Sequence, residues 1–600
     1  MSETLLRIGG ASGFWGDAAR ATPQLLAEGN LDYIVYDYLA EITMSIMARA
    51  RVKDDSMGYA TDFLAAAMKP NLKTIAQQGV KIISNAGGVN PQACAAGLRQ
   101  LIAEQGLSLT VACVTGDDLL PCAAQMEASD VREMFSGEAF PAVEKLLSVN
   151  AYLGAFPVAK ALAQGADIVV TGRCVDSAVT LGACIHAFGW TRTDYDQLAM
   201  GSLAGHILEC GPQATGGNFT DWEDVPDIPN IGYPIAEMRS DGSFVCTKPE
   251  GTGGLVNVGT VCEQMLYEIG DPQAYLLPDV VCDFSTAKVE QVGEHRVSVT
   301  GAMGTVAPDQ YKVSATYLDQ FRGGTYMSFY GIDADRKARA LGAAVLEASR
   351  NVFKAAGLAD FSETSIEILG AESQYGSFAS IESSREVVLK LAAKHPEAAG
   401  IGILLKEAVG LGLATPPGLS GFAGSRPRPS PVVRLFSCTV DKSTVSVSIQ
   451  LEDKSLNCDE VHGERFDSAR LTRPVDPAES AQEDWVEVPL VALAWGRSGD
   501  KGNKANVGII ARDPAYFAYI CNALTSAVVT ERFAHFLEDS GPGNVERYVM
   551  PGPSALNFLL HNVLGGGGVA SIRNDPQGKG YAQLLLDCPV LVPSKIAETL

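Results

Sequence analysis

The first third of the chain repeats one pattern, and this pattern limits the possible folds more than any other feature. Short apolar runs end in polar or glycine-rich residues and lead into stretches typical of helices, in residues 31–41, 79–91, 106–118 and 164–178. Strands that alternate with helices in this way build a mostly parallel sheet with helices on both faces. We therefore predict a Rossmann-like α/β region over residues 1–230.

Polar residues follow the predicted strands of this sheet. In α/β sheets, ligands bind beyond the carboxyl ends of the strands, where the connecting loops cluster. From these loops we take Asn85 and Asn90 as substrate-binding candidates. The full set that the rule places near a ligand is Asp37, Glu41, Asn85, Asn90, Asp117, Arg173 and Asp176.

From about Gly232 onward the pattern changes to that of antiparallel strands. We therefore expect an α+β region over residues 231–462, which forms one large domain together with residues 1–230. The signals are a hairpin in residues 288–301, two alternating runs in residues 438–451 and an amphipathic helix in residues 333–357.

The last part of the chain carries the signals of a smaller, separate domain. Residues 463–484 are polar and contain proline, and we interpret them as the inter-domain linker. Beyond it we expect a ferredoxin-like α+β domain over residues 485–600, with two helices against an antiparallel sheet. The expected strands are 485–496, 506–511, 545–551, 569–575 and 581–589, and the expected helices are 514–538 and 554–564.

Composition and charge limit the kinds of molecule that this protein is expected to bind. The formal net charge of −24 disfavours nucleic acid and anionic lipid surfaces. No apolar run is long enough to span a membrane and the N-terminus lacks the features of a signal peptide, so we expect a cytoplasmic protein. The 13 cysteines include no Cys-x-x-Cys pair and the 7 histidines no His-x-x-x-His pair, so the sequence requires no metal and no cofactor. We expect a homo-oligomer that binds a small molecule.

The first catalytic candidate is a short apolar segment that carries a histidine, a carboxylate and a thiol. In a helix from Ser202 to Glu209, His206 and Cys210 are four residues apart and share a face. Such a pair can lower the pKa of the thiol and make it a nucleophile or proton donor. In the alternative interpretation His206 simply pairs with Glu209, three residues on, and Cys210 closes the helix against the core.

The residues that follow this helix are candidates for holding a negatively charged oxygen. Thr215, the backbone amides of Gly216 and Gly217, and Asn218 are the kind of donors that an oxyanion needs. A purely structural turn would want the glycines, but not also an adjoining Glu-Cys pair. We therefore predict that this turn belongs to the active site.

Cationic side chains form the second group of candidates. Arg173 and Asp176 stand three apart at the exit of an apolar strand, where Arg173 suits capture of a carboxylate or phosphate. The alternative is an Arg–Asp pair that only ties the loop together. Lys248 leads into a glycine-rich loop at residues 251–254 that precedes a helix, another arrangement suited to an anion. In residues 497–506, which we expect to be a loop between strands, Arg497 and Lys501 are the anion-binding candidates.

Seven segments, taken together, resemble one known family. Five resemble the large N-terminal domain of the acyclic terpene utilisation protein family, AtuA: RIGGASGFWGD, SNAGGVNP, TGRCVDSA, GHILECGPQATGGN and KPEGTGGLVNVGTV. Two more, RSGDKGNKANVGIIAR and GGGGVASIRNDPQGK, resemble the ferredoxin-like domain that often follows it. The resemblance implies a part in the breakdown of branched acyclic terpenoids through coenzyme A thioesters. It implies no particular catalytic residue.

We predict a catabolic lyase of the hydratase or dehydratase type that acts on a branched organic acid or its acyl-CoA thioester. Coenzyme A would enter only as part of the substrate. Such chemistry needs an acid or base beside the reacting carbons and donors for an enolate oxygen. We assign proton transfer to Glu209 or Asp176, the oxyanion to Gly216, Gly217 and Asn218, and carboxylate or phosphate binding to Arg173, Lys248 and Lys501.

Two other functions are compatible with the same residues. The first is acyl transfer or thioester hydrolysis by Cys210, activated by His206. The second is a non-catalytic subunit that binds acyl-CoA and organises the enzymes of a pathway.

Overall fold

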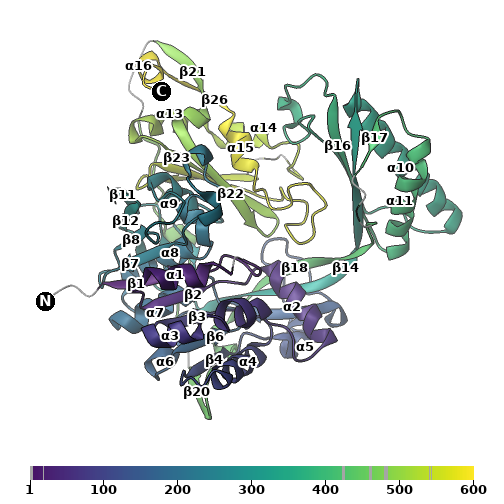
Figure 1. The fold of residues 1–600 in the computed structure, drawn as a ribbon. Helices are drawn as coiled ribbons and strands as arrows, with labels where there is room; N and C mark the ends of the chain where they lie inside the picture. Colours follow the sequence, from purple (N-terminus) through teal and green to yellow (C-terminus); the bar gives the residue numbers. More distant parts are fainter. Residues whose placement is uncertain are drawn as a thin grey trace.

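The structure is a computed structural model that describes residues 5–17, 19–421, 424, 426–458, 462–478, 484–539, 541 and 543–600. Part of the predicted linker, residues 479–483, lies outside the described residues. Figure 1 shows three parts of the molecule. We call the part that contains the N-terminal strands the body and the part on the right, with α10 (Ala334–Ala356) and α11 (Ala398–Gly410), the lobe. The C-terminal domain lies above the body.

An eleven-stranded sheet runs through the body. Its centre is parallel and has the order β1 (Leu6–Gly10), β2 (Tyr33–Tyr36), β3 (Lys81–Ser84), β6 (Ile168–Thr171) and β4 (Val111–Thr115). These strands are almost completely buried, as expected for a sheet that helices cover on both faces. The predicted α/β class is confirmed.

Two separate hydrophobic cores show which helices cover each face. Leu25, Met47, Ile75 and Leu98 belong to one core. They come from α1 (Ala21–Glu28), α2 (Glu41–Lys53), α3 (Leu72–Gln78) and α4 (Pro91–Glu104). The other core contains residues of α6 (Phe156–Ala163), α7 (Ala178–Phe188), α8 (Tyr195–Leu208) and α9 (Val258–Met265).

Antiparallel strands from the second half of the large domain extend this sheet at both edges. Next to β1 lie β7 (Ile235–Met238), β8 (Phe244–Thr247), β12 (Arg296–Thr300) and β11 (Lys288–Gly293), and next to β4 lie β19 (Val447–Leu451) and β20 (Lys454–Cys458). The predicted hairpin, β11 and β12, is present. Residues 1–230 and 231–462 therefore share one sheet.

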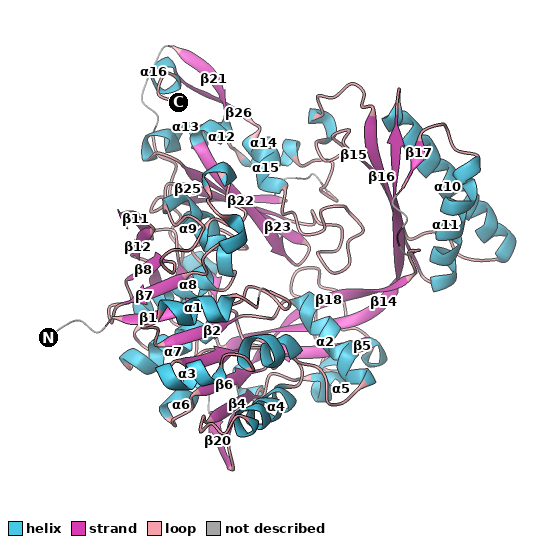
Figure 2. Ribbon diagram, in the orientation of Figure 1, coloured by secondary structure: helices cyan, strands magenta, loops and turns pink. Residues whose placement is uncertain are grey.

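The lobe is built on one long strand, β14 (Gln310–Tyr330). Its first half pairs with β18 (Ser430–Asp441) and β5 (Leu146–Ala151), and its second half with β16 (Glu386–His395) and β17 (Leu419–Ser420). β15 (Glu363–Leu369) completes the sheet at the far side of β16. The predicted amphipathic helix is α10 (Ala334–Ala356), which packs on this sheet together with α11 (Ala398–Gly410), as Figure 2 shows.

The C-terminal domain has a four-stranded antiparallel sheet with the order β22 (Ala494–Lys501), β23 (Lys504–Ala511), β25 (Ala555–Leu560) and β24 (Val545–Met550). The helices α13 (Phe517–Ala523), α14 (Ser526–Arg532) and α15 (Tyr581–Leu586) share its hydrophobic core. The predicted ferredoxin-like α+β class is confirmed. The shorter elements of the protein are α5 (Ala123–Ala128), β9 (Tyr275–Leu276), β10 (Val281–Asp283), β13 (Met303–Thr305), β21 (Trp485–Pro489), α12 (Leu490–Leu493), β26 (Pro589–Pro593) and α16 (Ser594–Ala597).

Several elements predicted for this domain are wrong. Residues 554–564 contain strand β25 in place of a helix, and residues 581–589 begin with helix α15 in place of a strand. Both are short, mostly apolar runs, and periodicity cannot separate a buried strand from a buried helix over such a length. Residues 569–575 contain no strand, the helix expected at 514–538 is split into α13 and α14, and most of the loop expected at 497–506 belongs to β22 and β23.

Two buried asparagines attach the C-terminal sheet to the body. Along β23 and β25 alternate side chains enter the domain's own core, and Asn506 and Asn557 point from the opposite face. The Asn557 Nδ2 donates to the carbonyls of Ile269 (2.9 Å) and Gly270 (2.6 Å), and the Asn506 Nδ2 donates to that of Leu266 (2.5 Å). These carbonyls belong to the segment that follows α9, and buried carbonyls outside regular structure need donors from elsewhere in the protein.

We expect Asn557→Ala to lower the free energy of unfolding by about 1–3 kcal/mol, because two buried carbonyls lose their donor. Urea denaturation measures the change. Asn351→Ala, at an exposed position of α10, is the matched control and should stay within about 0.5 kcal/mol of the parent protein. Equal effects of the two substitutions would show that the asparagine contacts do not stabilise the domain interface.

A search of the helices within the described ranges finds no span long and apolar enough to cross a bilayer.

Candidate active site

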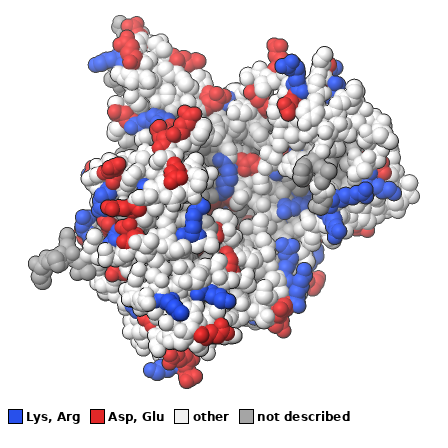
Figure 3. All heavy atoms as spheres, viewed as in Figure 1, with Lys and Arg blue, Asp and Glu red and all other residues white. Residues whose placement is uncertain are grey.

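A cavity of about 530 Å³ lies where the body, the first half of the β14 sheet and the C-terminal domain meet. Its wall includes the apolar side chains Leu276, Leu277, Leu435 and Phe466. It also includes the charged side chains Arg173, Asp176, Lys312, Asp500 and Lys501. A cavity that combines apolar lining residues with a few charged groups is the usual form of a small-molecule site. Figure 3 shows a hollow between the lobe and the rest of the molecule, with Lys and Arg side chains near it.

Arg173 occupies the loop after β6, at the carboxyl end of the parallel sheet. Its guanidinium is buried and donates to the carbonyls of Leu39 (3.2 Å) and Cys174 (3.0 Å) and to the Asp176 Oδ1 (2.5 Å). Its carbon Cζ lies 4.1 Å from the centre of the Tyr152 ring. Arg173 therefore ties the loop together, as in the alternative interpretation, and its side chain also lines the cavity.

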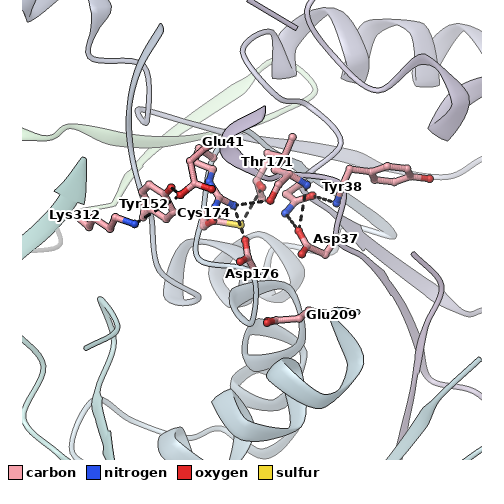
Figure 4. A network of polar contacts seen from close by, with 12 residues as sticks. Asp37, Tyr38, Glu41, Tyr152, Thr171, Cys174, Asp176, Glu209 and Lys312 are labelled. Atoms are coloured by element: carbon pink, nitrogen blue, oxygen red, sulfur yellow. Dashed lines mark hydrogen bonds and ion pairs between the residues drawn. The ribbon is translucent and has the colours of Figure 1, made fainter. Parts of the chain in front are cut away.

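Tyr152, Glu41 and Lys312 continue this network along the cavity wall, as Figure 4 shows. The Tyr152 hydroxyl donates to the Glu41 Oε1 (2.8 Å), and the Lys312 Nζ lies 3.7 Å from the same oxygen. Burial alone would raise the pKa of Glu41, but Lys312, Arg173 and the Tyr152 hydroxyl together lower it to about 2. Glu41 is therefore a permanent anion at neutral pH.

Lys501 enters the cavity from the C-terminal domain, at the tip of the hairpin formed by β22 and β23. Within the part of the chain that the structure describes, its Nζ makes no hydrogen bond and no ion pair, and it lies 5.8 Å from the centre of the Tyr275 ring. Burial disfavours its charge, but the nearby Tyr275, Glu268 and Asp176 outweigh this effect and raise the pKa of Lys501. The cavity therefore contains a fixed positive charge with room for an anion.

Two family models match the chain. The model described as acyclic terpene utilisation family protein AtuA matches residues 6–451, and that of the AtuA ferredoxin-like domain matches residues 488–591. The chain belongs to the AtuA family. No curated protein and no solved structure matches it.

Both matched ranges contribute to the cavity. The AtuA domain supplies Arg173, Asp176 and most of the apolar lining residues, and the AtuA ferredoxin-like domain supplies Asp500 and Lys501. Among the described residues, no three His, Cys, Asp or Glu side chains come together in a way that could hold a metal ion.

The predicted activation of Cys210 by His206 in the AtuA domain is wrong. The His206 Nδ1 lies 2.8 Å from the Glu209 Oε1, which is the alternative pairing. Burial and the charge of Glu209 raise the pKa of the Cys210 thiol well above its usual value, so the thiol stays neutral. The Glu209 side chain, paired with His206, is nearly buried, and burial raises its pKa. Glu209 does not line the cavity.

Iodoacetamide labelling at pH 7 provides a test of this conclusion. Because thiolates react and neutral thiols do not, we expect Cys210 to be labelled at least about tenfold more slowly than the exposed Cys122. Peptide mass spectrometry measures both rates, and Cys122→Ala identifies the fast site. Preferential labelling of Cys210 would restore the nucleophile hypothesis.

The predicted oxyanion donors are used inside the turn itself. The Gly216 amide donates to the Gln213 carbonyl and the Gly217 amide to the Pro212 carbonyl (2.8 Å). The Thr215 hydroxyl donates to the Gly232 carbonyl at 2.5 Å. Gly216 has φ +106°, a conformation that favours glycine, so the Gly-Gly pair is explained by the turn. The oxyanion prediction is therefore wrong for these amides.

Asn218 and Arg497 lie in a second, separate pocket of about 240 Å³. The Arg497 Nη1 donates to the Asn218 carbonyl at 3.1 Å, and its Cζ lies 4.7 Å from the centre of the Tyr267 ring. Lys579 also lines this pocket. The structure therefore does not bring Asn218 and Arg497 to the cavity that contains Arg173.

The three remaining candidates have structural partners. The Asn85 amide group bonds to Asp37 and accepts from the Tyr38 amide (2.8 Å), and Asn90 caps α4. The Lys248 Nζ donates to the Thr252 carbonyl (2.7 Å) and closes the glycine-rich loop. Of the residues that the sequence places near a ligand, the cavity brings together Glu41, Arg173, Asp176 and Lys501. Sequence reasoning did not select Tyr152, Tyr275 or Lys312, since no local motif marks them.

Proposed function

We propose that this AtuA protein is a hydro-lyase that adds water to, or removes it from, a branched organic acid or its thioester. The observation that carries the proposal is that the cavity wall combines apolar side chains with Lys501, a cation for which the described residues supply no hydrogen-bond or ion-pair partner. A branched acid offers groups for both, a hydrocarbon chain and a carboxylate or thioester. The family, named for acyclic terpene utilisation, supports a catabolic role.

In the proposed reaction Lys501 binds the oxygen that becomes negative when the carbon next to the carboxyl or thioester group loses its proton. Arg173, which Asp176 holds in place at 2.5 Å, orients the same end of the molecule. The apolar wall around Leu276 and Leu435 takes the hydrocarbon chain and limits the access of bulk water. Of the two carboxyls assigned to proton transfer from the sequence, only Asp176 lies on this wall.

The test is turnover by the purified protein on a panel of branched 3-hydroxy and 2,3-unsaturated compounds. Each is supplied as the free acid and as the coenzyme A thioester. We expect loss or gain of the conjugated double bond for one class, and deuterium at the carbon next to the carboxyl group when the reaction runs in D₂O. Saturable binding of the same compounds without turnover would contradict an enzymatic function and favour a non-catalytic binding subunit.

A further inference from the structure

One carboxyl on the cavity wall comes from the ferredoxin-like domain, that of Asp500 in β22. Its two oxygens differ. Oδ1 accepts from the Gln577 Nε2 (3.1 Å) and from the Lys579 Nζ (3.2 Å). Among the described residues Oδ2 accepts no hydrogen bond. One oxygen is therefore held in place by the protein, and the other keeps its hydrogen-bonding capacity for a ligand.

Three of the four other carboxyls on the cavity wall, those of Glu41, Asp176 and Glu268, are already committed to cationic partners, and the fourth is that of Asp309. Glu41 is a permanent anion, as described above. The Asp176 Oδ1 accepts a hydrogen bond from the buried Arg173 at 2.5 Å, so this carboxyl is already engaged in holding the guanidinium. The Glu268 Oε1 lies 2.9 Å from the Lys579 Nζ, and the cations Lys579 and Lys501 overcome burial and lower the pKa of Glu268.

Asp500 is in a different environment. Burial and the negative charge of Glu268 raise its pKa to about 6, although Lys579 acts in the opposite direction. The charged groups that face Asp500 are Glu268 after α9, Lys579 in the segment before α15, Glu41 at the start of α2, and its neighbour Lys501. A carboxyl that titrates near the working pH is effective as both acid and base.

We propose that Asp500 is the proton-transfer residue of this cavity and that Lys579 is its positioning residue. The inference rests on the proposed hydro-lyase function. In dehydration the C2–H bond breaks, and its proton goes to the Asp500 Oδ2. The electron pair forms the C2–C3 double bond as the C3–O bond breaks. The departing hydroxide takes the proton from Oδ2 and leaves as water, so Asp500 ends as it began. Hydration is the reverse.

Lys579 connects Asp500 to the second pocket. Its Nζ contacts the Asp500 Oδ1, the Glu268 Oε1 and the Tyr267 hydroxyl, and its side chain also lines the pocket that contains Asn218 and Arg497. The wall between the two hollows is therefore a charged cluster centred on Lys579. This geometry lets Lys579 fix the orientation of Asp500 without contacting the ligand.

Asp500→Asn tests the catalytic role. We expect kcat to fall at least about 100-fold, because a positioned acid or base contributes this much or more. Calorimetric binding of a branched saturated acid, which cannot react, should change less than about threefold. Asp513→Asn is the matched control, since Asp513 caps a short turn in the same domain away from the cavity. It should leave kcat unchanged.

Lys579→Met tests the positioning role through the pH profile. Loss of the cation raises the pKa of Asp500, so the limb of the kcat profile that reports the ionised base should move upward by about one pH unit. Lys579→Arg keeps the charge and should return the limb most of the way to its original position. A merely structural contact would lower stability and leave the limb in place.

Three results would overturn the inference. The first is that the Asp500→Asn variant keeps more than a third of the parent kcat. The second is that the pH profile of kcat for Lys579→Met superimposes on that of the parent enzyme. The third is that the parent protein turns over none of the compounds. The last result ends the proposed function as well. The first two leave that function standing, because the parent enzyme still turns over, and remove only the assignment of Asp500 and Lys579.

Discussion

Arg173→Met should destabilise the protein more than any other single substitution at the cavity, lowering the free energy of unfolding by about 3–5 kcal/mol. The guanidinium is buried, binds two carbonyls and the Asp176 carboxylate, and lies against Tyr152. Methionine matches the length of the side chain but leaves a carboxylate without its cation and two carbonyls without a donor. Urea denaturation followed by tryptophan fluorescence measures the loss.

The control for this substitution is Arg336→Met on the surface of α10. Arg336 also forms an ion pair with a carboxylate three residues away, Asp333, but both side chains are largely exposed. We expect a change below about 0.5 kcal/mol, since exposed ion pairs contribute little. If the two variants lose equal stability, burial of Arg173 is not what makes its contacts strong.

Lys501→Met should reduce the affinity for a branched carboxylic acid about 30- to 150-fold, which corresponds to about 2–3 kcal/mol. Among the described residues the Lys501 ammonium group has no ion-pair or hydrogen-bond partner, whereas Arg173 and Lys312 each have a carboxylate partner. A bound carboxylate would therefore gain a charge-assisted contact without displacing an existing one. Isothermal titration calorimetry measures the dissociation constant.

Lys595→Met in α16 serves as the control, because Lys595 is exposed and belongs to the same domain. It removes the same charge from the net total and should leave the affinity within about twofold. The remaining affinity of Lys501→Met should also depend less on salt, since a charge pair has been lost. Unchanged affinity would place the anion elsewhere and remove the main support for the proposed function.

The sequence was informative where a pattern was long. The alternation of strands and helices in residues 1–230 predicts the parallel sheet, and the 23-residue α10 follows its amphipathic pattern to the end. In the C-terminal domain the apolar runs of β25 and α15 are only 6 residues each, and both were assigned to the wrong element. Their identity depends on neighbours that sequence periodicity does not reveal.

Only part of the candidate site can be predicted from the sequence, because the other part depends on partners that are distant along the chain. Arg173 and Asp176 lie where the loops of a parallel sheet meet, so a general rule of α/β folds locates them. The donors near Gly216 are equally polar, but their partners come from the same turn and from Gly232. Lys501 reaches the cavity from more than 300 residues away along the chain, and no local signal in the sequence indicates which cavity it enters.

The position of the cavity at a domain boundary has a consequence for how such proteins evolve. Neither domain contains a complete site, and Asn506 and Asn557 fix the contact between them through bonds to the backbone after α9. Backbone carbonyls are present whatever side chains occupy those positions, so this attachment tolerates sequence drift in the body. Under the proposed function the cavity-facing residues do not have that freedom, and a change of substrate would require changes in both domains.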